Sequence, residues 1–214
     1  MYASIGMQGD LCYAVSSLSR YLKNPEYHHW KAAKHVLRYL KGTTNHAMEY
    51  NAKELVLRGY ADADWGADKE DRRSITGYVF LLGDAAISTK SRKQPTVSES
   101  STEAEYMATY FAVSEAMYLC MLLKELGHEQ ATTVIRVDNQ ACITIASKPV
   151  LRSRVKHIDM KYHFIREHVM SKDIDVTYIS TKDQVADILT KALPASRFEK
   201  HCEAMGLGTH RVLV

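Results

Sequence analysis

The stretch GYADADWG at residues 59–66 decides how this sequence is interpreted, because an apolar run, LVLRGY, leads there into two aspartates. Such a run before Asp62 is typical of a strand, and Gly66 lets the chain turn away. Two carboxylates at the end of a strand fit a solvated loop edge, a calcium site or one corner of a catalytic metal site. The choice depends on whether the rest of the chain supplies further acids.

The bulk composition is that of a globular protein able to bury a core. Of the 214 residues, 46% are hydrophobic and 25% are charged. The net charge of +3 permits a polyanionic partner without requiring one. The four cysteines are far apart and form no CxxC pair, so we expect neither a zinc site nor a disulfide framework. No apolar run approaches the ~20 residues of a membrane span and no signal-peptide pattern is present, so we expect an intracellular protein that does not bind membranes.

The hydrophobic periodicity predicts a helical preface followed by an α/β domain. Three consecutive strands favour an antiparallel meander, and strands that alternate with helices favour parallel crossovers. We therefore expect a five-stranded mixed sheet flanked by helices, with an N-terminal helical extension. The expected elements are two helices within 11–41, strands at about 55–62, 76–82 and 85–91, a helix at 100–127, a strand at 132–137, helices at 140–147 and 157–170, a strand at 175–180 and a helix at 183–193.

Four acidic residues occupy comparable places in this order: Asp62, Glu105, Asp138 and Asp187. Asp62 and Asp138 end the first and fourth predicted strands, so they emerge together if those strands are neighbours. A helix that crosses the sheet can then bring Glu105 above them. Clustered carboxylates repel one another, and they stay ionised together only with cations among them. Mg²⁺ accepts such oxygen ligands, and two ions ~4 Å apart can promote hydrolysis of a phosphodiester.

Structural explanations compete with this interpretation. Asp62 and Asp64 also fit a solvated strand end, and Asp187 fits an exposed helix position. Asp138 followed by Asn139 fits a helix entry, because both residue types are preferred N-caps. Spacing alone leaves these alternatives open.

The glutamate of the long predicted helix has a structural explanation of its own. Thr102-x-x-Glu105 matches a capping box, which would account for an acid at this position without catalysis. Glu103 lies two residues away, about 200° around the helix. Only one of Glu103 and Glu105 can therefore face a common site.

Five segments resemble, in the same order, the ribonuclease H domain at the end of the Pol polyprotein of copia-type LTR retrotransposons. The resemblance covers roughly residues 54–194. The preface at 12–43 looks like the tail of the reverse transcriptase that precedes this domain in the family. The polymerase motif YxDD does not occur, so we do not expect DNA synthesis. The matching segments are GYADADWGADKEDRRSITGYVFLL, KSRKQPTVSESSTEAEYMA, VDNQACI, KHIDMKYHFIREHV and TKDQVADILTKALP.

The resemblance implies a ribonuclease H-like fold and a division of the chain into three parts. A helical extension resembling the reverse transcriptase tail would occupy residues 1–50, the ribonuclease H-like domain 51–195 and a C-terminal tail 196–214. The apolar faces of the extension predict that it docks on a partner domain or a second chain.

The resemblance also implies a catalytic and metal-binding set, which is Asp62, Glu105, Asp138 and Asp187. Asp64 is a less favoured substitute for Asp62, and the register of EYMA selects Glu105 over Glu103. The implied cofactor is a pair of Mg²⁺ ions, with Mn²⁺ as an alternative. Cellular enzymes carry a histidine before the last helix that assists turnover, and YISTKDQ at 178–184 has none.

Basic and amide side chains supply candidates for binding nucleic acid. Lys and Arg attract phosphates, and an RNA–DNA hybrid is recognised by its shape and sugars more than by its bases. The alternative for each basic cluster is a solvated charged face. The candidates are Lys90, Arg92, Lys93, Asn139, Gln140, Arg152, Arg154 and Lys156.

These observations lead to one preferred function and two rivals. The preferred function is an endonuclease that hydrolyses the RNA strand of RNA–DNA hybrids during retrotransposon reverse transcription. Its expected partners are the hybrid and the reverse transcriptase domain of the same polyprotein, within a cytoplasmic particle. The rivals are a catalytically decayed module that binds nucleic acid or connects to the polymerase, and a nuclease of the same fold that acts on duplex DNA.

Overall fold

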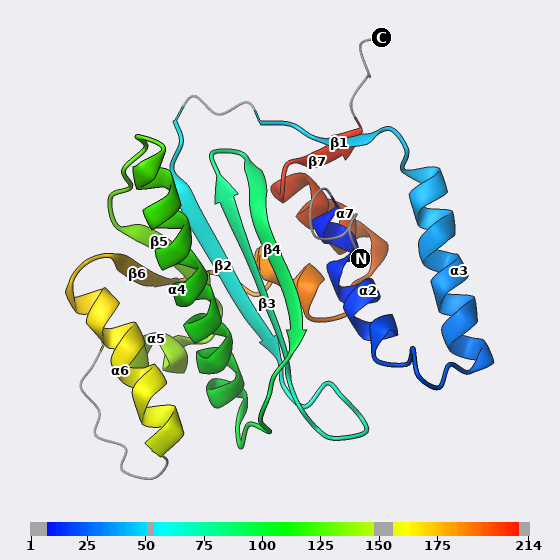
Figure 1. Cartoon of the computed structure of the whole chain (residues 1–214), viewed down its shortest axis with the longest axis horizontal. Coiled ribbons are helices and arrows are strands. Elements are labelled where there is room, and N and C mark those ends of the chain that lie inside the picture. The colour runs from blue at the N-terminus through cyan, green and yellow to red at the C-terminus, as the bar shows by residue number, and fades with distance from the viewer. Residues whose placement is uncertain (1–7, 51–53, 148–155, 210–214) are drawn as a thin grey trace.

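A five-stranded mixed sheet forms the centre of the protein (Figure 1). The structure is a computed structural model, and it describes residues 8–50, 54–147 and 156–209. The strand order is β4-β3-β2-β5-β6; β2, β3 and β4 are antiparallel, while β5 runs parallel to both β2 and β6. The predicted mixed sheet with an antiparallel meander and parallel crossovers is therefore confirmed. The strands are β2 (Leu57–Asp64), β3 (Ile75–Leu82), β4 (Ala85–Lys93), β5 (Thr133–Val137) and β6 (Ile174–Tyr178).

Helices cover both faces of this sheet. Successive side chains of a strand point to opposite faces, and β3 shows this clearly. Tyr78 and Phe80 pack in one core with helices α4, α5 and α6, whereas Val79 and Leu81 pack in a second core with η2, α7 and β7. The first core is built on α4 (Ser101–Glu125), α5 (Gln140–Ser147) and α6 (Lys156–Met170), and the second on α2 (Cys12–Ser19), the 3-10 helix η2 (Val185–Leu189) and α7 (Ala195–Ala204).

The N-terminal segment lies on the side of the second core. It consists of a short 3-10 turn, η1 (Gly9–Leu11), then α2 and α3 (Tyr27–Gly42). No residue of α3 is buried, and Trp30 and Leu37 are more than half exposed. Tyr39 of α3 contacts α7, because its ring meets the ring of Phe198 edge-on with centroids 5.8 Å apart.

A second, two-stranded sheet, which the sequence did not predict, joins the end of the N-terminal segment to the C-terminal end of the described chain. β1 (His46–Met48) pairs antiparallel with β7 (Leu207–Thr209). Residues 195–209 thus form a helix and a strand that pack on the main sheet and pair with the N-terminal segment. The boundaries at residues 50 and 195 remain a prediction.

The last predicted helix, 183–193, is shorter and tighter than expected. It is the single 3-10 segment η2, and all five of its residues are buried. The side chain of Gln184 holds its start by accepting a hydrogen bond from the Ala186 N–H and donating one to the Ala61 carbonyl at 2.9 Å. A segment buried on all sides has no solvent face to continue as an amphipathic helix, and Pro194 follows it at the N-cap of α7.

Helix α4 has the length and apolar composition of a membrane span, the one such helix in the described part of the chain. Half of that stretch is buried inside the fold. Its apolar residues pack on the sheet as part of the first core.

Gly77 brings η2 against the sheet beside the predicted acids. It pairs with Asp62 across β2 and β3, and a Cβ at this position would lie 2.8 Å from Leu189 Cβ and 2.7 Å from Thr190 Cγ2. We expect Gly77→Ala to lower the free energy of unfolding by about 1–3 kcal/mol, because η2 would have to move away from the strand. Chemical denaturation measures this change. Gly42→Ala is the control, since an added Cβ there meets nothing within 4 Å; equal stability of both variants would contradict the expectation.

Candidate metal centre

The parallel pairing of β2 and β5 brings Asp62 and Asp138 to the same edge of the sheet. Both strands run in the same direction with Tyr60 opposite Arg136, so the acids two residues further on emerge together. Helix α4 packs across β2 and adds Glu105 from its second turn. One carboxylate oxygen from each of these three residues lies within 4.8 Å of the others. The structure therefore brings three of the four predicted acids into one cluster.

The cap of α4 explains why Glu105 is available for this cluster. Ser100 is the N-cap and accepts a hydrogen bond from the Glu103 N–H at 3.2 Å, while the Glu103 carboxylate accepts one from the Glu99 N–H at 2.7 Å. The capping box predicted for Thr102 and Glu105 is thus wrong. The helix begins two residues earlier, and Glu103 performs the capping while Glu105 lies inside the fold.

Burial and mutual repulsion make this cluster a poor place for negative charge without a cation. Asp62 is 1% exposed and Glu105 is 7% exposed. Burial, helped by the charges of Asp187 and Asp138, raises the pKa of Asp62 to about 7, against the opposing effects of Lys191 and Thr190. Burial also raises the pKa of Glu105 well above its ordinary value, and the charges of Asp62 and Asp138 add to this. A divalent cation would remove this cost.

The donor set fits a hard divalent ion. All three residues offer carboxylate oxygens, which are the ligands that Mg²⁺ and Mn²⁺ prefer in proteins. The Glu105 Oε2 atom is buried and has no hydrogen-bond partner. A buried acceptor is seldom left unpaired, so this oxygen is suited to a metal ion.

The fourth predicted acid, Asp187, lies beside the cluster and forms ion pairs with two basic side chains, Lys191 and Arg197. Asp187 is fully buried; its Oδ1 atom lies 2.8 Å from Lys191 Nζ, and its other oxygen pairs with Arg197. The same Lys191 ammonium lies 3.6 Å from Asp62 Oδ2, which also accepts a short hydrogen bond from the Thr190 hydroxyl. Lys191 therefore links Asp187 to the three-acid cluster.

Thr190, Lys191 and Arg197 are the residues that sequence reasoning missed. Thr190 and Lys191 belong to the matched segment TKDQVADILTKALP, and Lys191 follows Asp187 by four residues. The four-residue spacing on a predicted helix could have indicated that Lys191 pairs with Asp187. Nothing in the sequence pointed to Arg197, because it lies on α7 in the predicted tail.

Asp64 is the last residue of β2, two positions after Asp62, and its side chain is partly exposed. Burial raises its pKa, and the charge of Asp187 adds to this while Lys191 opposes it. It does not belong to the group of three acids whose oxygens converge. Asp62 does belong to that group, and its preference over Asp64 as the catalytic residue stays a prediction.

The basic candidates on β4 differ in their surroundings. Lys93 is held by two carboxylates, with its Nζ atom 2.9 Å from Asp68 Oδ2 and 2.8 Å from Asp71 Oδ2. Lys90 and Arg92 are exposed, and the Arg92 guanidinium lies 5.8 Å from the centre of the Phe111 ring. Lys90 and Arg92 are therefore better placed for phosphate contacts than Lys93.

The candidates near α5 and α6 can be placed only in part. Asn139 caps α5, because its side-chain oxygen accepts a hydrogen bond from the Cys142 N–H at 3.0 Å. Gln140 is exposed at the first position of α5. The other candidates are Arg152 and Arg154, which lie outside the described residues, and Lys156, whose backbone begins α6 but whose side chain lies outside them.

Lys191 should weaken ion binding, because its ammonium repels a divalent cation that shares Asp62. We expect Lys191→Gln to tighten Mg²⁺ binding by roughly 3–10-fold, the effect of removing a unit charge that lies close to the ion on a side chain that is itself 32% exposed. Calorimetric titration with Mg²⁺, without nucleic acid, measures this affinity. Lys182→Gln is the control, since Lys182 is exposed on the loop before η2. Unchanged or weaker affinity in Lys191→Gln would contradict the expectation.

Fold and site together define an α/β protein with a candidate divalent-metal centre at the edge of a mixed sheet. The chain is 41% identical over 207 residues to the retrovirus-related Pol polyprotein from transposon TNT 1-94 of Nicotiana tabacum. This alignment covers 97% of the chain and 16% of the relative. It is 44% identical over 200 residues to the retrovirus-related Pol polyprotein from transposon RE2 of Arabidopsis thaliana. This alignment covers 92% of the chain and 14% of the relative. The chain thus belongs to the retrovirus-related Pol polyproteins of copia-type transposons, as the motifs predicted, and spans a small part of their length.

The structure is similar to the crystal structure of RNase H1 from the halophilic archaeon Halobacterium salinarum NRC-1, with 15% identity, coverage of 63% of this chain and 93% of that chain, and a TM-score of 0.43. No protein-family model matches the chain.

Proposed function

We propose that this chain hydrolyses the RNA strand of RNA–DNA hybrids with the help of divalent ions bound by Asp62, Glu105 and Asp138. The observation that carries the proposal is the convergence of three carboxylates, two of them buried, from two parallel strands and a crossing helix. Membership of the Pol polyproteins supports the choice of substrate, because reverse transcription produces RNA–DNA hybrids.

The side chains around the cluster hold the reacting groups in place. Thr190 fixes one oxygen of Asp62 by its hydrogen bond, which leaves the other oxygen free for an ion. Arg197 and Lys191 compensate the charge of the buried Asp187 carboxylate with two ion pairs. Bound Mg²⁺ would lower the pKa of an attacking water and stabilise the departing 3′ oxygen. The products would carry 5′-phosphate and 3′-hydroxyl ends, and no side chain would become covalently attached.

We propose Asp187 as a ligand of a second ion that it would share with Asp62. Lys191 supports this assignment, because its ammonium lies close to both carboxylates and a cation therefore fits between them. The resident ions would be Mg²⁺, with Mn²⁺ able to replace them. Lys191 would have to withdraw from the pair when the second ion binds.

We further propose that the chain works next to the reverse transcriptase domain of the same polyprotein. The relatives are Pol polyproteins of which it covers 14–16%. The partly exposed helix α3, with Trp30 and Leu37 at its surface, is available for such a neighbour. An intracellular, cytoplasmic particle is the proposed location.

Cleavage of a labelled hybrid tests the function directly. We expect Mg²⁺-dependent cutting of the RNA strand of a hybrid, abolished by EDTA, with no cutting of duplex DNA or single-stranded RNA of the same sequence. Asp138→Asn should remove the activity, whereas Asp175→Asn, on the exposed surface of β6, should keep it. Hybrid binding without cutting would favour the decayed module, and cutting of duplex DNA would favour the other nuclease.

A further inference from the structure

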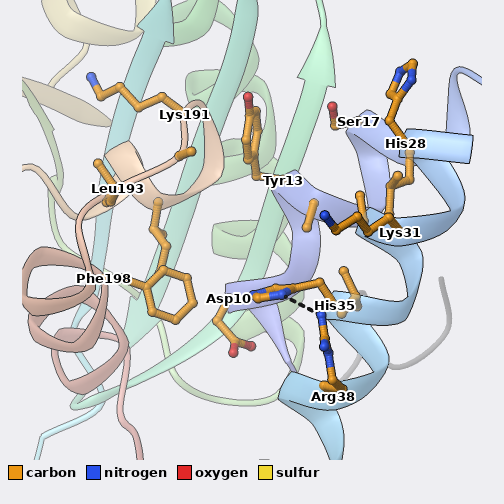
Figure 2. A pocket seen from close by; sticks show the side chains of 16 residues that line it. Asp10, Tyr13, Ser17, His28, Lys31, His35, Arg38, Lys191, Leu193 and Phe198 are labelled. Atoms are coloured by element: carbon orange, nitrogen blue, oxygen red, sulfur yellow. Dashed lines mark hydrogen bonds between the residues drawn. The ribbon is translucent and has the colours of Figure 1, made fainter.

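A groove between the N-terminal helices and the η2–α7 segment lies next to the metal centre. Its volume is about 610 Å³, and Lys191 both lines it and contacts Asp62 of the acid cluster. Figure 2 shows Lys191, Leu193 and Phe198 on one side of the opening and Lys31, His35 and Arg38 on the other. A ligand in this groove would therefore lie close to the reacting phosphate of the proposed site.

One wall of the groove is strongly basic. Helix α3, with the sequence YHHWKAAKHVLRYLKG, has four Lys or Arg residues, three His residues and no acid. Lys31 and Arg38 face the groove and are exposed, and neither forms an ion pair among the described residues. The Arg38 guanidinium hydrogen-bonds to His35 Nδ1 at 3.2 Å, and this ring nitrogen is the acceptor because a guanidinium only donates. Such a wall favours an anionic ligand.

One buried group in the groove calls for a hydrogen-bond donor. Asp10 is 4% exposed and lines the groove, and its Oδ2 atom accepts a hydrogen bond from the Tyr39 hydroxyl at 2.6 Å. Its Oδ1 atom is buried without a well-placed hydrogen-bond partner; burial raises the pKa of this carboxyl, although the backbone N–H groups of Asp10 and Leu11 act against this larger effect. A small shift of the Asp10 side chain toward the groove would let this acceptor pair with a donor carried by the ligand. A phosphate cannot supply one, but the amino or imino group of a nucleobase can.

Most of the remaining lining is apolar or aromatic, with Ser17 and His28 as further polar members. Tyr13 and Phe198 present rings (Figure 2). Leu18 and Val36 add aliphatic surface. In a duplex the base faces are stacked and cannot reach such walls, whereas an unpaired base can. The volume is also within the range of pockets that enclose one small ligand, about 300–1,000 Å³.

We propose that this groove binds unpaired nucleotides of a single strand that extends from the hybrid at the metal centre. The phosphates would lie against Lys31 and Arg38, and a base would enter between the apolar walls and donate a hydrogen bond to Asp10. The position of the groove rests on the proposed function, but strand binding itself does not require cleavage. The ligand class is single-stranded nucleic acid, RNA or DNA.

Fluorescence anisotropy tests the proposal with the full chain in EDTA, where no cleavage occurs. The probes are a blunt RNA–DNA hybrid and the same hybrid with a short RNA or DNA extension at one end. We expect an extension to tighten binding by roughly 10-fold, within the range for one or two stacked bases. Lys31→Gln combined with Arg38→Gln should abolish this gain and leave binding of the blunt hybrid nearly unchanged. The RNA and DNA extensions show which strand enters.

Two further variants distinguish binding in the groove from general attraction of nucleic acid to the basic helix α3. Lys34→Gln combined with Lys41→Gln removes the same charge from α3 at positions outside the groove, and should keep the gain. Ala32→Trp fills the groove without a change of charge, and should abolish it. Loss of two phosphate contacts should also reduce the slope of log affinity against log salt by roughly 1.4.

Three results would overturn the proposal: no gain from any extension, equal losses in the two double variants, or full displacement of the extended strand by poly-glutamate at equal charge. Failure of the proposed function gives a different result, because a blunt hybrid then stays uncut in Mg²⁺ whatever the groove binds. Strand preference and cleavage are thus measured separately.

Discussion

Asp62→Asn is expected to lower the rate of hybrid cleavage by on the order of 10³-fold while leaving the protein folded. Asp62 lies at the centre of the site, because it joins Glu105 and Asp138 in the cluster and contacts Lys191. An amide binds divalent ions far less well than a carboxylate, and a bound ion supplies several kcal/mol of transition-state stabilisation, where each 1.36 kcal/mol is tenfold in rate. Single-turnover cleavage of a labelled hybrid measures the loss.

The same variant separates catalysis from stability. Asn keeps an oxygen that can accept the Thr190 hydrogen bond, and it removes a buried charge. The free energy of unfolding without metal at neutral pH should therefore stay the same or rise, as urea denaturation would show. Asp175→Asn, an exposed change of the same kind, is the control for both measurements. Retained cleavage in Asp62→Asn, or joint loss of folding and cleavage, would contradict the assignment.

Without divalent ions, the protein should lose stability as the pH rises from about 4 to about 7. Asp62 has an ordinary pKa of 3.8 and a pKa of about 7 in the folded protein. The folded state therefore binds this proton more tightly, so the stabilisation is fully present below the unfolded pKa and disappears as the pH rises through the folded one. The raised pKa of Glu105 acts in the same direction. The total change should be on the order of a few kcal/mol, since each pKa unit corresponds to about 1.4 kcal/mol.

Mg²⁺ should reverse this trend, because the ions bind the ionised carboxylates and their binding releases protons. Thermal unfolding at several pH values, with EDTA and with Mg²⁺, tests the expectation. The lowered pKa of His201 acts in the opposite sense, so the difference between the native chain and Asp62→Asn isolates the cluster. The pH dependence without metal should be shallower in Asp62→Asn. Identical curves for the two proteins would contradict the argument.

Local patterns predicted the elements that form the site. The run before Asp62 is β2 and the β-branched run before Asp138 is β5. The sequence argument required these two strands to be neighbours without predicting it, and the structure pairs them in parallel. The choice of Glu105 over Glu103 depended on the resemblance, because spacing and the capping rule allowed either. Only the structure shows that Ser100 and Glu103 form the cap.

Other features depended on contacts between distant segments, and the sequence could not predict them. The segment with Asp187 has the composition of a helix, yet burial on all sides reduces it to the short η2. Leu119 and Leu123 of α4 are buried in the first core, whereas Leu122 and Leu126 of the same helix are 38% and 64% exposed. The partners of Asp187 come from Lys191, four residues on, and from Arg197 on α7.

The pairing of β1 with β7 bears on how this nuclease candidate can be dissected. A fragment limited to residues 51–195 would lack both of these strands and the guanidinium of Arg197, so Asp187 would keep a single counter-charge in the interior. Proteolytic removal of either flank would also leave an unpaired strand edge, which favours association between molecules. The smallest fragment suited to enzymology therefore runs from the first helices through β7.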